Sequence, residues 1–179
     1  MKSKTVKSWR MAAVIAASMG VSCFPGMAMA AVHVELAVDG TTAPPRLYVI
    51  LNDSKCRGGA DDCIEVAKGS SHNLFFDLDD SCKASGPEYR LAQFRIAMNS
   101  KDWPTSGNPL PPHVANDFDA DPNTGFVNLA SGENQLKDER IKLRDKNSSA
   151  YEVFYEITAV SCTGSGEIKL DPTIRNGGK

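Results

Sequence analysis

Apolar and polar side chains alternate along much of this chain, and this period of two restricts the fold more than any other feature. The clearest example is "AYEVFYEITAVSC" at residues 150–162. Val153 and Tyr155 fall on one face of the expected strand, while Phe154 and Val160 fall on the other. Because both faces carry apolar residues, the pattern predicts a central strand covered on both sides; the alternative is a surface that pairs with another subunit in an oligomer.

The same alternation recurs before and after this stretch. Strands are expected at residues 32–38, 46–52, 63–69, 72–78, 89–99, 125–130, 140–147 and 166–174. The triplet "GSS" at 69–71 predicts a hairpin turn between two of them. No helical pattern is long enough to alternate with the strands, which disfavours a parallel α/β enzyme fold. We therefore expect an all-β fold, an antiparallel β-sandwich that is immunoglobulin-like in the broad sense.

The first thirty residues have the composition of a secretory signal peptide. Four basic residues and no acid occur in "MKSKTVKSWR", an apolar run follows, and "AMA" at 28–30 offers a cleavage site. The apolar run is too short to span a bilayer comfortably. We expect residues 1–30 to be removed together with Cys23, leaving a single domain at 31–179. With no second long apolar run, the mature chain has no expected membrane span, and its predicted location is periplasmic or secreted.

Charge narrows the class of partner. Without the four basic residues of the leader, 16 Lys and Arg face 22 Asp and Glu, a net charge of −6. An acidic surface repels phosphate backbones, so nucleic acid is excluded as an expected partner, whereas a cation or a basic partner is attracted.

Four cysteines remain in the mature chain: Cys56, Cys63, Cys82 and Cys162. In an oxidising compartment an even number predicts two disulfides, for which three connectivities are possible. We favour Cys56–Cys63, because the glycine-bearing loop "CRGGADDC" can bend back on itself, and this leaves Cys82–Cys162. A zinc site is disfavoured because the chain has no CxxC pair.

A long proline-rich connection at 99–125 interrupts the strands, and connections of this length are often functional. We take Trp103 and His113 within it as candidate contact residues for a protein or saccharide partner. The alternative for Trp103 is that it folds back and covers an edge of the sandwich, as large aromatic side chains commonly do.

The same connection holds the candidate metal ligands Asp117, Asp119, Asp121 and Asn123. Carboxylates at alternate positions resemble the first ligands of a calcium loop, since calcium prefers oxygen donors. However, Pro122 stands where such a loop requires glycine, and the twelfth position lacks the bidentate glutamate. The alternative is a turn in which Asp and Asn side chains bond to their own backbone. No other cofactor is expected.

Catalytic motifs are absent from the sequence. It contains no HExxH, GxSxG or SxxK, and no phosphate loop or dinucleotide fingerprint. We therefore expect an exported binding or assembly module without an evident catalytic site. Two alternatives stay open: a carboxylate-based hydrolase of the cell envelope, for which the decisive spacing is spatial, and a calcium-dependent binding module.

The C-terminal stretch "GEIKLDPTIRNGG" carries a D-P-x-I-x-N pattern at Asp171, Pro172, Ile174 and Asn176. This ending resembles that of small bacterial DP-EP proteins and, more distantly, that of AidA/PixA inclusion-body proteins. The resemblance covers residues 166–178. It implies a compact β-sandwich, and it implies no established biochemical role.

Overall fold

The computed structural model describes most of the predicted mature chain. The described residues are 30–67, 71–78, 82–83, 88–130, 132–137, 139–164 and 166–178. The predicted signal peptide lies outside them except for its last residue, and so does Cys23. In the part of the chain that is described, no helix is both long and apolar enough to cross a membrane.

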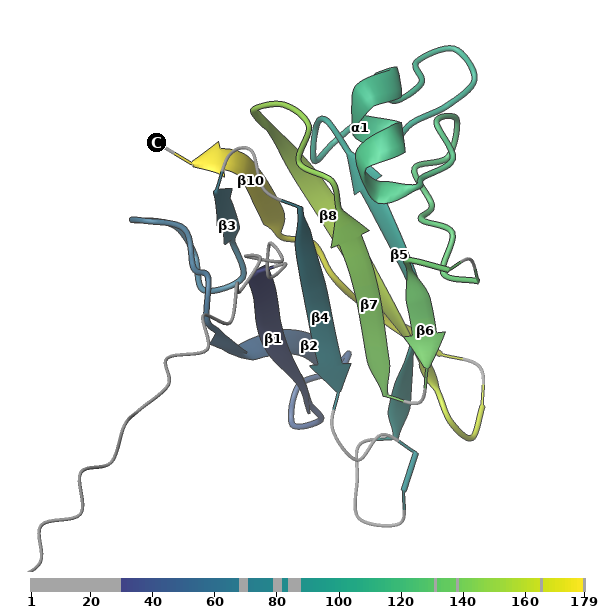
Figure 1. Ribbon diagram of the computed structural model, residues 1–179. Coiled ribbons are helices and arrows are strands. Elements are labelled where there is room, and N and C mark those ends of the chain that lie inside the picture. Colours follow the sequence, from purple (N-terminus) through teal and green to yellow (C-terminus); the bar gives the residue numbers. More distant parts are fainter. Residues whose placement is uncertain are drawn as a thin grey trace, which may run out of the picture.

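Ten strands and one short helix form the described fold. They are β1 (Ala30–Asp39), β2 (Arg46–Asn52), β3 (Ile64–Ala67), β4 (His72–Leu78), β5 (Tyr89–Ala97), α1 (Pro112–Phe118), β6 (Gln135–Lys137), β7 (Arg140–Asp145), β8 (Tyr151–Ser161), β9 (Glu167–Leu170) and β10 (Thr173–Gly178). Sheet A has the strand order β2-β1-β4-β7-β6, and sheet B has the order β3-β10-β8-β5, with β9 also paired to β8 (Figure 1). The all-β prediction is confirmed.

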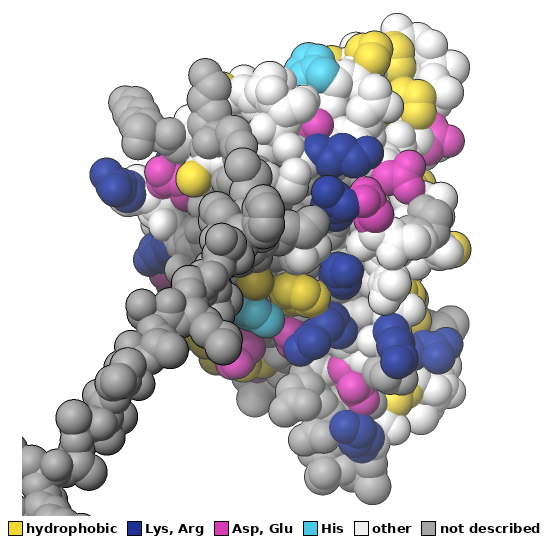
Figure 2. Space-filling view, in the orientation of Figure 1, with side chains coloured by type: hydrophobic (Ala, Val, Ile, Leu, Met, Phe, Trp, Pro, Cys, Tyr) yellow, Lys and Arg dark blue, Asp and Glu magenta, His cyan; other side chains and the backbone are white. Residues whose placement is uncertain are grey.

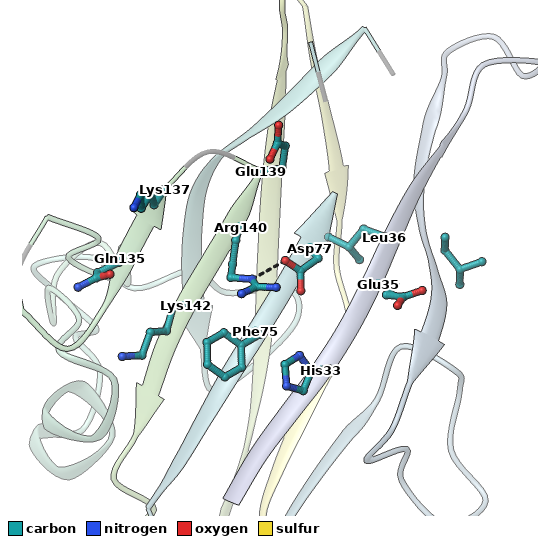
Figure 3. Close-up of a pocket in the computed structure, with 11 residues that line it drawn as sticks. His33, Glu35, Leu36, Phe75, Asp77, Gln135, Lys137, Glu139, Arg140 and Lys142 are labelled. Atoms are coloured by element: carbon teal, nitrogen blue, oxygen red, sulfur yellow. Dashed lines mark hydrogen bonds and ion pairs between the residues drawn. The ribbon is translucent and has the colours of Figure 1, made fainter. Parts of the chain in front are cut away.

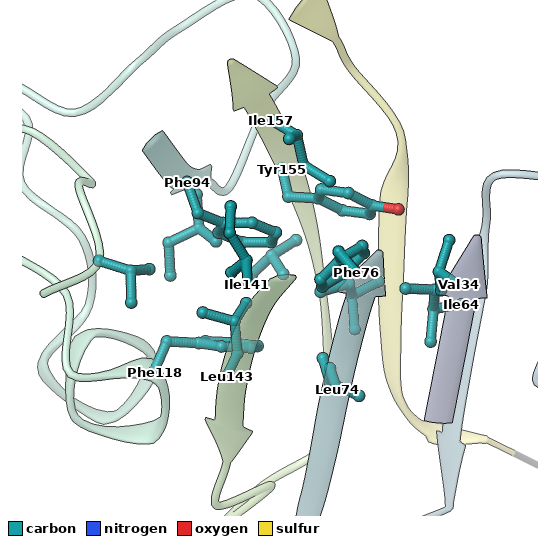
Figure 4. Close-up of a cluster of buried hydrophobic side chains, with 14 of the residues drawn as sticks. Val34, Ile64, Leu74, Phe76, Phe94, Phe118, Ile141, Leu143, Tyr155 and Ile157 are labelled. Carbon is teal, nitrogen blue, oxygen red and sulfur yellow. The ribbon is translucent and has the colours of Figure 1, made fainter. Parts of the chain in front are cut away.

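The core lies between the two sheets and is built by the alternation seen in the sequence. In β4 every second side chain is buried, and Phe76 is fully enclosed. Its ring lies 5.2 Å from Phe94 of β5 and 5.5 Å from Tyr155 of β8, measured between centroids (Figure 4). The Tyr155 hydroxyl donates to the Asp62 carbonyl at 3.1 Å, which satisfies its one buried polar atom. The apolar side chains of both sheets therefore meet in one core.

The prediction of purely antiparallel sheets is wrong. β1 pairs with β4 in parallel, as β10 does with β3. The expected hairpin at 69–71 is also wrong, because β3 belongs to sheet B while β4 belongs to sheet A; residues 68–70 lie outside the described residues. The chain thus leaves sheet A after β2, passes through sheet B as β3, and enters β4 running in the same direction as β1.

β8 occupies the centre of sheet B, as its two apolar faces predicted. It pairs with β5 on one side and with β9 and β10 on the other. The expected single strand at 166–174 is divided, because β9 ends before Asp171 and β10 begins after Pro172. The Pro172 carbonyl still accepts a hydrogen bond from the Tyr155 amide at 2.9 Å. Proline fits this break because it has no amide hydrogen to contribute to a ladder.

Both expected disulfides are present. Cys56 and Cys63 are joined across the short loop, with Cα atoms 5.3 Å apart, and Cys82 and Cys162 are joined with Cα atoms 5.6 Å apart. Gly59 is required in the short loop, since a Cβ there would lie 2.8 Å from the Cβ of Cys56. Two disulfides indicate an oxidising environment for this chain.

The connection at 99–125 contains a helix that the sequence did not predict. It contains α1, where Pro112 starts the helix and Val114, Ala115 and Phe118 are buried. Seven residues are too few for a recognisable helical period, so the pattern was missed. The strand expected at 125–130 is reduced to isolated bridges at Phe126 and Val127, and β6 was not predicted.

Gly125 attaches the end of this connection to β5. Its carbonyl accepts a hydrogen bond from the Ile96 amide at 2.9 Å, and the Phe94 carbonyl accepts one from Val127. Gly125 has a φ of +75°, and a Cβ there would lie 2.2 Å from the Ile96 carbonyl oxygen. Only glycine allows both the conformation and the close approach.

Candidate functional site

The outward face of sheet A contains a hollow of about 830 Å³. Neighbouring strands β1, β4 and β7 form its floor, with contributions from β2 and β6 (Figure 3). Since alternate side chains of each strand point away from the core, residues that are not contiguous in sequence come together on this face. We take it as the candidate ligand site.

Two stacked rings form the apolar part of the hollow. His33 of β1 and Phe75 of β4 are cross-strand partners, and their rings stack with centroids 4.8 Å apart and planes 14° apart. Both rings are visible side by side in Figure 3. Ile50 of β2 extends the apolar surface and is 60% exposed.

A β-bulge brings Ile50 to this position. The register between β1 and β2 shifts so that Leu51 faces Glu35 while Val49 faces Leu36, which leaves Ile50 without an opposite residue. An extra residue in one strand bends it and re-aims its side chains, and such bulges are frequent on edge strands and beside functional sites. The bulge therefore accounts for a large apolar side chain exposed at the rim of the hollow.

Charged side chains surround the rings. Arg140 of β7 faces Asp77 of β4, and its Nε lies 2.5 Å from the Asp77 Oδ1. The hydrogen bond to Asp77 raises the pKa of Arg140, and the guanidinium carbon lies 5.3 Å from the Phe75 ring centroid. Lys137 and Lys142 also line the hollow, and neither forms an ion pair with any described residue. Cationic groups are thus available to a ligand beside an apolar platform.

The period of two in β7 produces these cations. In "RIKLRD" the buried residues Ile141 and Leu143 alternate with Arg140, Lys142 and Arg144. Figure 2 shows Lys and Arg side chains gathered along this face. Sequence reasoning missed the site because the net charge of the chain is negative, although alternate basic residues on one strand were the available signal.

The predicted contact residues lie elsewhere. Trp103 is half-buried and covers Arg95 of β5, whose guanidinium carbon is 3.8 Å from the indole centroid. Arg95 in turn pairs with Glu156 of β8, Nε to Oε1, at 2.8 Å. His113 is exposed on α1 and meets Tyr151 edge-on at 5.7 Å. Neither Trp103 nor His113 lines the hollow of sheet A.

The four predicted calcium ligands are not brought together by the fold. Asp117 is buried, and its Oδ2 accepts hydrogen bonds from the Ser148 amide and hydroxyl and, at 2.7 Å, from the Tyr151 hydroxyl. Asp121 is exposed, and its Oδ1 accepts from the amide of Asn123 at 2.7 Å. Asp119 follows α1 with a φ of 54° and is exposed.

Burial around Asp117 shifts the pKa of a neighbouring hydroxyl group. Burial, followed by the hydrogen bond to Asp117, raises the pKa of Tyr151, so this hydroxyl stays protonated and donates. Across the described ranges, no group of three or more His, Cys, Asp and Glu side chains is arranged to hold a metal.

Three carboxylates line the hollow, those of Glu35, Asp77 and Glu139, and Glu35 and Asp77 are direct neighbours. They are cross-strand partners on the parallel strands β1 and β4. A glycosidase needs one carboxyl group as proton donor, but Asp77 is held by Arg140 as an ion pair. The arrangement is better suited to holding a polar ligand than to donating a proton.

Comparison with known proteins adds no homologue to this description. A scan against protein-family models finds no match, and a search of curated proteins finds no significant match. The resemblance of residues 166–178 to DP-EP proteins stays a prediction.

Proposed function

We propose that this chain is an exported, non-catalytic binding module and that it holds a saccharide in the hollow of sheet A. The observation that carries this proposal is the stacked His33–Phe75 pair with cationic side chains beside it. Sites for small organic ligands combine an apolar surface with a few convergent polar groups, which is the combination found here.

The chemistry of a sugar ring fits this surface. One side of a pyranose presents C–H groups that pack on an aromatic ring, while its hydroxyls lie around the rim and need hydrogen-bond partners. His33 and Phe75 supply the platform, and Gln135, Lys142 and Glu35 supply donors and acceptors around it. The cations favour a saccharide that carries carboxylate or phosphate groups.

A protein partner fits the hollow less well. The buried centres of protein interfaces are depleted in Lys and Glu, whereas this hollow is lined by Lys137, Lys142, Glu35 and Glu139. An extended, hydrated ligand leaves such side chains partly in water and avoids the cost of desolvating them.

The export route and the fold family belong to the same proposal. Two disulfides support an oxidising compartment outside the cytoplasm, and the composition of residues 1–30 supports signal-directed export to the periplasm or beyond. Two sheets enclosing one core support an immunoglobulin-like sandwich in the broad sense, with the parallel pairs as additions to that plan.

Glycan-array screening of the disulfide-intact chain, followed by titration calorimetry on the strongest hit, tests the proposal. We expect an acidic polysaccharide to bind, and Phe75→Ala to weaken binding at least about tenfold through loss of the platform. Phe126→Ala removes an exposed aromatic outside the hollow and serves as the matched control. Absence of any glycan ligand, or an equal loss in both variants, contradicts the proposal.

The hydrolase alternative has its own readout. Incubating the bound polysaccharide with the protein should release no reducing ends, because the ion pair with Arg140 keeps Asp77 ionised and unable to act as a proton donor. Release that disappears in Asp77→Asn would replace the binding module with an enzyme.

A further inference from the structure

Four buried oxygen atoms at one end of the sheets have no hydrogen-bond partner. They are Asp145 Oδ2, Asn147 Oδ1, Ser149 Oγ and Asn176 Oδ1. Elsewhere among the described residues, the only buried side-chain atoms without a hydrogen bond are the Nε atoms of Arg95 and Arg144, and Arg95 Nε still forms an ion pair with Glu156. Because a buried polar atom without a partner costs free energy, these oxygens call for a partner that the described residues do not supply.

Hydrogen bonds bring Asp145, Asn147 and Asn176 together, and Ser149 follows two residues after Asn147 in the same turn. β7 ends at Asp145, whose Oδ1 accepts the Asn147 amide at 2.8 Å. Asn176 of β10 donates from Nδ2 to the same Oδ1 at 3.3 Å, so the other end of its amide also lies close to this carboxylate. Asp145, Asn147 and Asn176 are 0%, 2% and 5% exposed, and their free oxygens therefore have little access to bulk water.

The sequence of this turn has the spacing of a cation-binding loop. Asp145, Asn147 and Ser149 place oxygen-bearing side chains at alternate positions, as the first three ligands of a calcium loop are placed. Asn147 has a φ of 47°, a conformation that Asn adopts more readily than most residues. The half-buried Ser149 and the exposed Ser148 connect the group to the surface.

Two buried carboxylates, those of Asp117 and Asp145, lie in this region. Asp117 reaches the same region through Tyr151 and Ser148, and neither Asp117 nor Asp145 forms an ion pair with a described residue. A bound cation would coordinate the unpartnered oxygens and balance the negative charge of the two carboxylates.

We propose that Asp145, Asn147, Ser149 and Asn176 bind one calcium ion, with Asp117 as the second negative charge. The donors are carboxylate, amide and hydroxyl oxygens, which a hard cation prefers, and calcium tolerates irregular sets of six to eight oxygens completed by water or backbone carbonyls. Zinc would instead select imidazole or thiolate groups. This site is separate from the hollow of sheet A and from the exposed turn at 119–123.

A thermal melt of the purified, disulfide-intact chain tests the site. Samples at pH 8 in chelator are compared with samples in calcium, magnesium or sodium chloride at matched ionic strength. Calcium at about 100 times its Kd should raise the Tm by roughly 5–10 °C, and magnesium and sodium should raise it less. Titration calorimetry should give one calcium per chain.

Two variants locate the ion. Ser149→Ala removes a hydroxyl that has no partner, so it should leave the Tm in chelator almost unchanged while weakening calcium several-fold. Asn176→Asp places a second carboxylate beside Asp145, so it should lower the Tm in chelator and enlarge the shift caused by calcium. Asp121→Asn, in the exposed turn, is the matched control and should bind calcium as the wild type does.

Three outcomes would overturn the proposal. In the first, the Tm and the calorimeter show no response to calcium, which means that water or a proton satisfies the oxygens. In the second, Asp121→Asn weakens calcium binding while Ser149→Ala and Asn176→Asp leave it unchanged, which places the ion at the exposed turn. In the third, sodium and magnesium shift the Tm as much as calcium, which indicates general screening.

Discussion

The stretches at 117–121 and 145–149 have the same spacing of oxygen-bearing side chains, and the fold places them in opposite environments. In the first, Asp121 is exposed and caps the backbone of its own turn. In the second, Asp145 is fully buried and keeps an oxygen without a partner. Spacing alone therefore says little about a site, because the same pattern forms a solvated turn in one place and a buried turn with unpartnered oxygens in the other.

Asp117 shows how the two stretches are connected. It belongs to the first in sequence, but α1 turns its side chain toward the second, where it accepts hydrogen bonds from Ser148 and Tyr151. The Lys146 amide also donates to the Asp117 carbonyl at 3.1 Å. Packing of the connection at 99–125 thus decides whether a carboxylate within it is buried or exposed.

The largest loss of stability should come from detaching the connection at 99–125 from β5. Gly125→Ala combines a left-handed φ with a Cβ 2.2 Å from the Ile96 carbonyl oxygen, so we expect a loss of about 3–5 kcal/mol in the free energy of unfolding. Gly58→Ala is the control, since it has a similar φ but nothing within 4 Å of the added Cβ. Urea denaturation measures both; equal losses would show that the close approach does not anchor the connection.

Removing the connecting carboxylate should have the next largest effect. Asp117→Ala leaves the Tyr151 hydroxyl and the Ser148 amide without their acceptor, and we expect a loss of about 2–4 kcal/mol. Asp121→Ala should cost no more than about 1 kcal/mol, because water replaces its role in the turn. If chemical denaturation shows the two variants to be equally stable, the contrast between the buried and exposed stretches is wrong.

The loss of stability should be smaller at Trp103, near the start of the same connection. Trp103→Ala removes the ring over Arg95 and should cost about 1 kcal/mol by urea titration. Tyr48→Ala, at an exposed position of β2, should fall within about 0.5 kcal/mol of the wild type. A neutral Trp103→Ala would mean that the indole contributes nothing to folding and is free to serve a partner.

Two surface carboxylates should give the smallest effects, with opposite signs. Burial and then Glu156 raise the pKa of Asp171, so its charged form destabilises the folded state, and this penalty is relieved as the pH falls. Hydrogen bonds from Thr41 lower the pKa of Asp39, so the stability that it contributes is lost as the pH falls.

Melting curves between about pH 6 and pH 3 distinguish these two signs. Asp171→Asn should be more stable than the wild type at the upper end and lose that advantage in acid. Asp39→Asn should be less stable at the upper end and converge with the wild type in acid. Slopes of the same sign for both variants would contradict the assignment of their environments.

Most strands and the short disulfide were predictable because they depend on local patterns, and the long disulfide then followed as the remaining pair. Alternation identified β1, β4 and β8, since a half-buried strand shows its two faces directly in the sequence. The pairing of Cys56 with Cys63 followed from a loop that can close on itself. By contrast, "GSS" at 69–71 did not predict the sheet to which β4 belongs, because a short polar connection can join strands of one sheet or of two.

By itself the sequence determined which side chains of regular strands such as β1, β4 and β8 face the core, because that depends only on the geometry of successive residues. It did not determine which strands become neighbours, and both candidate sites depend on neighbours: His33 stacks on Phe75 across a parallel pair, and Asn176 reaches Asp145 from β10. These contacts join residues that are 42 and 31 positions apart. Only the packing of the two sheets decided them, because the free energy of burying apolar faces is shared by the whole core and is not a property of any one segment.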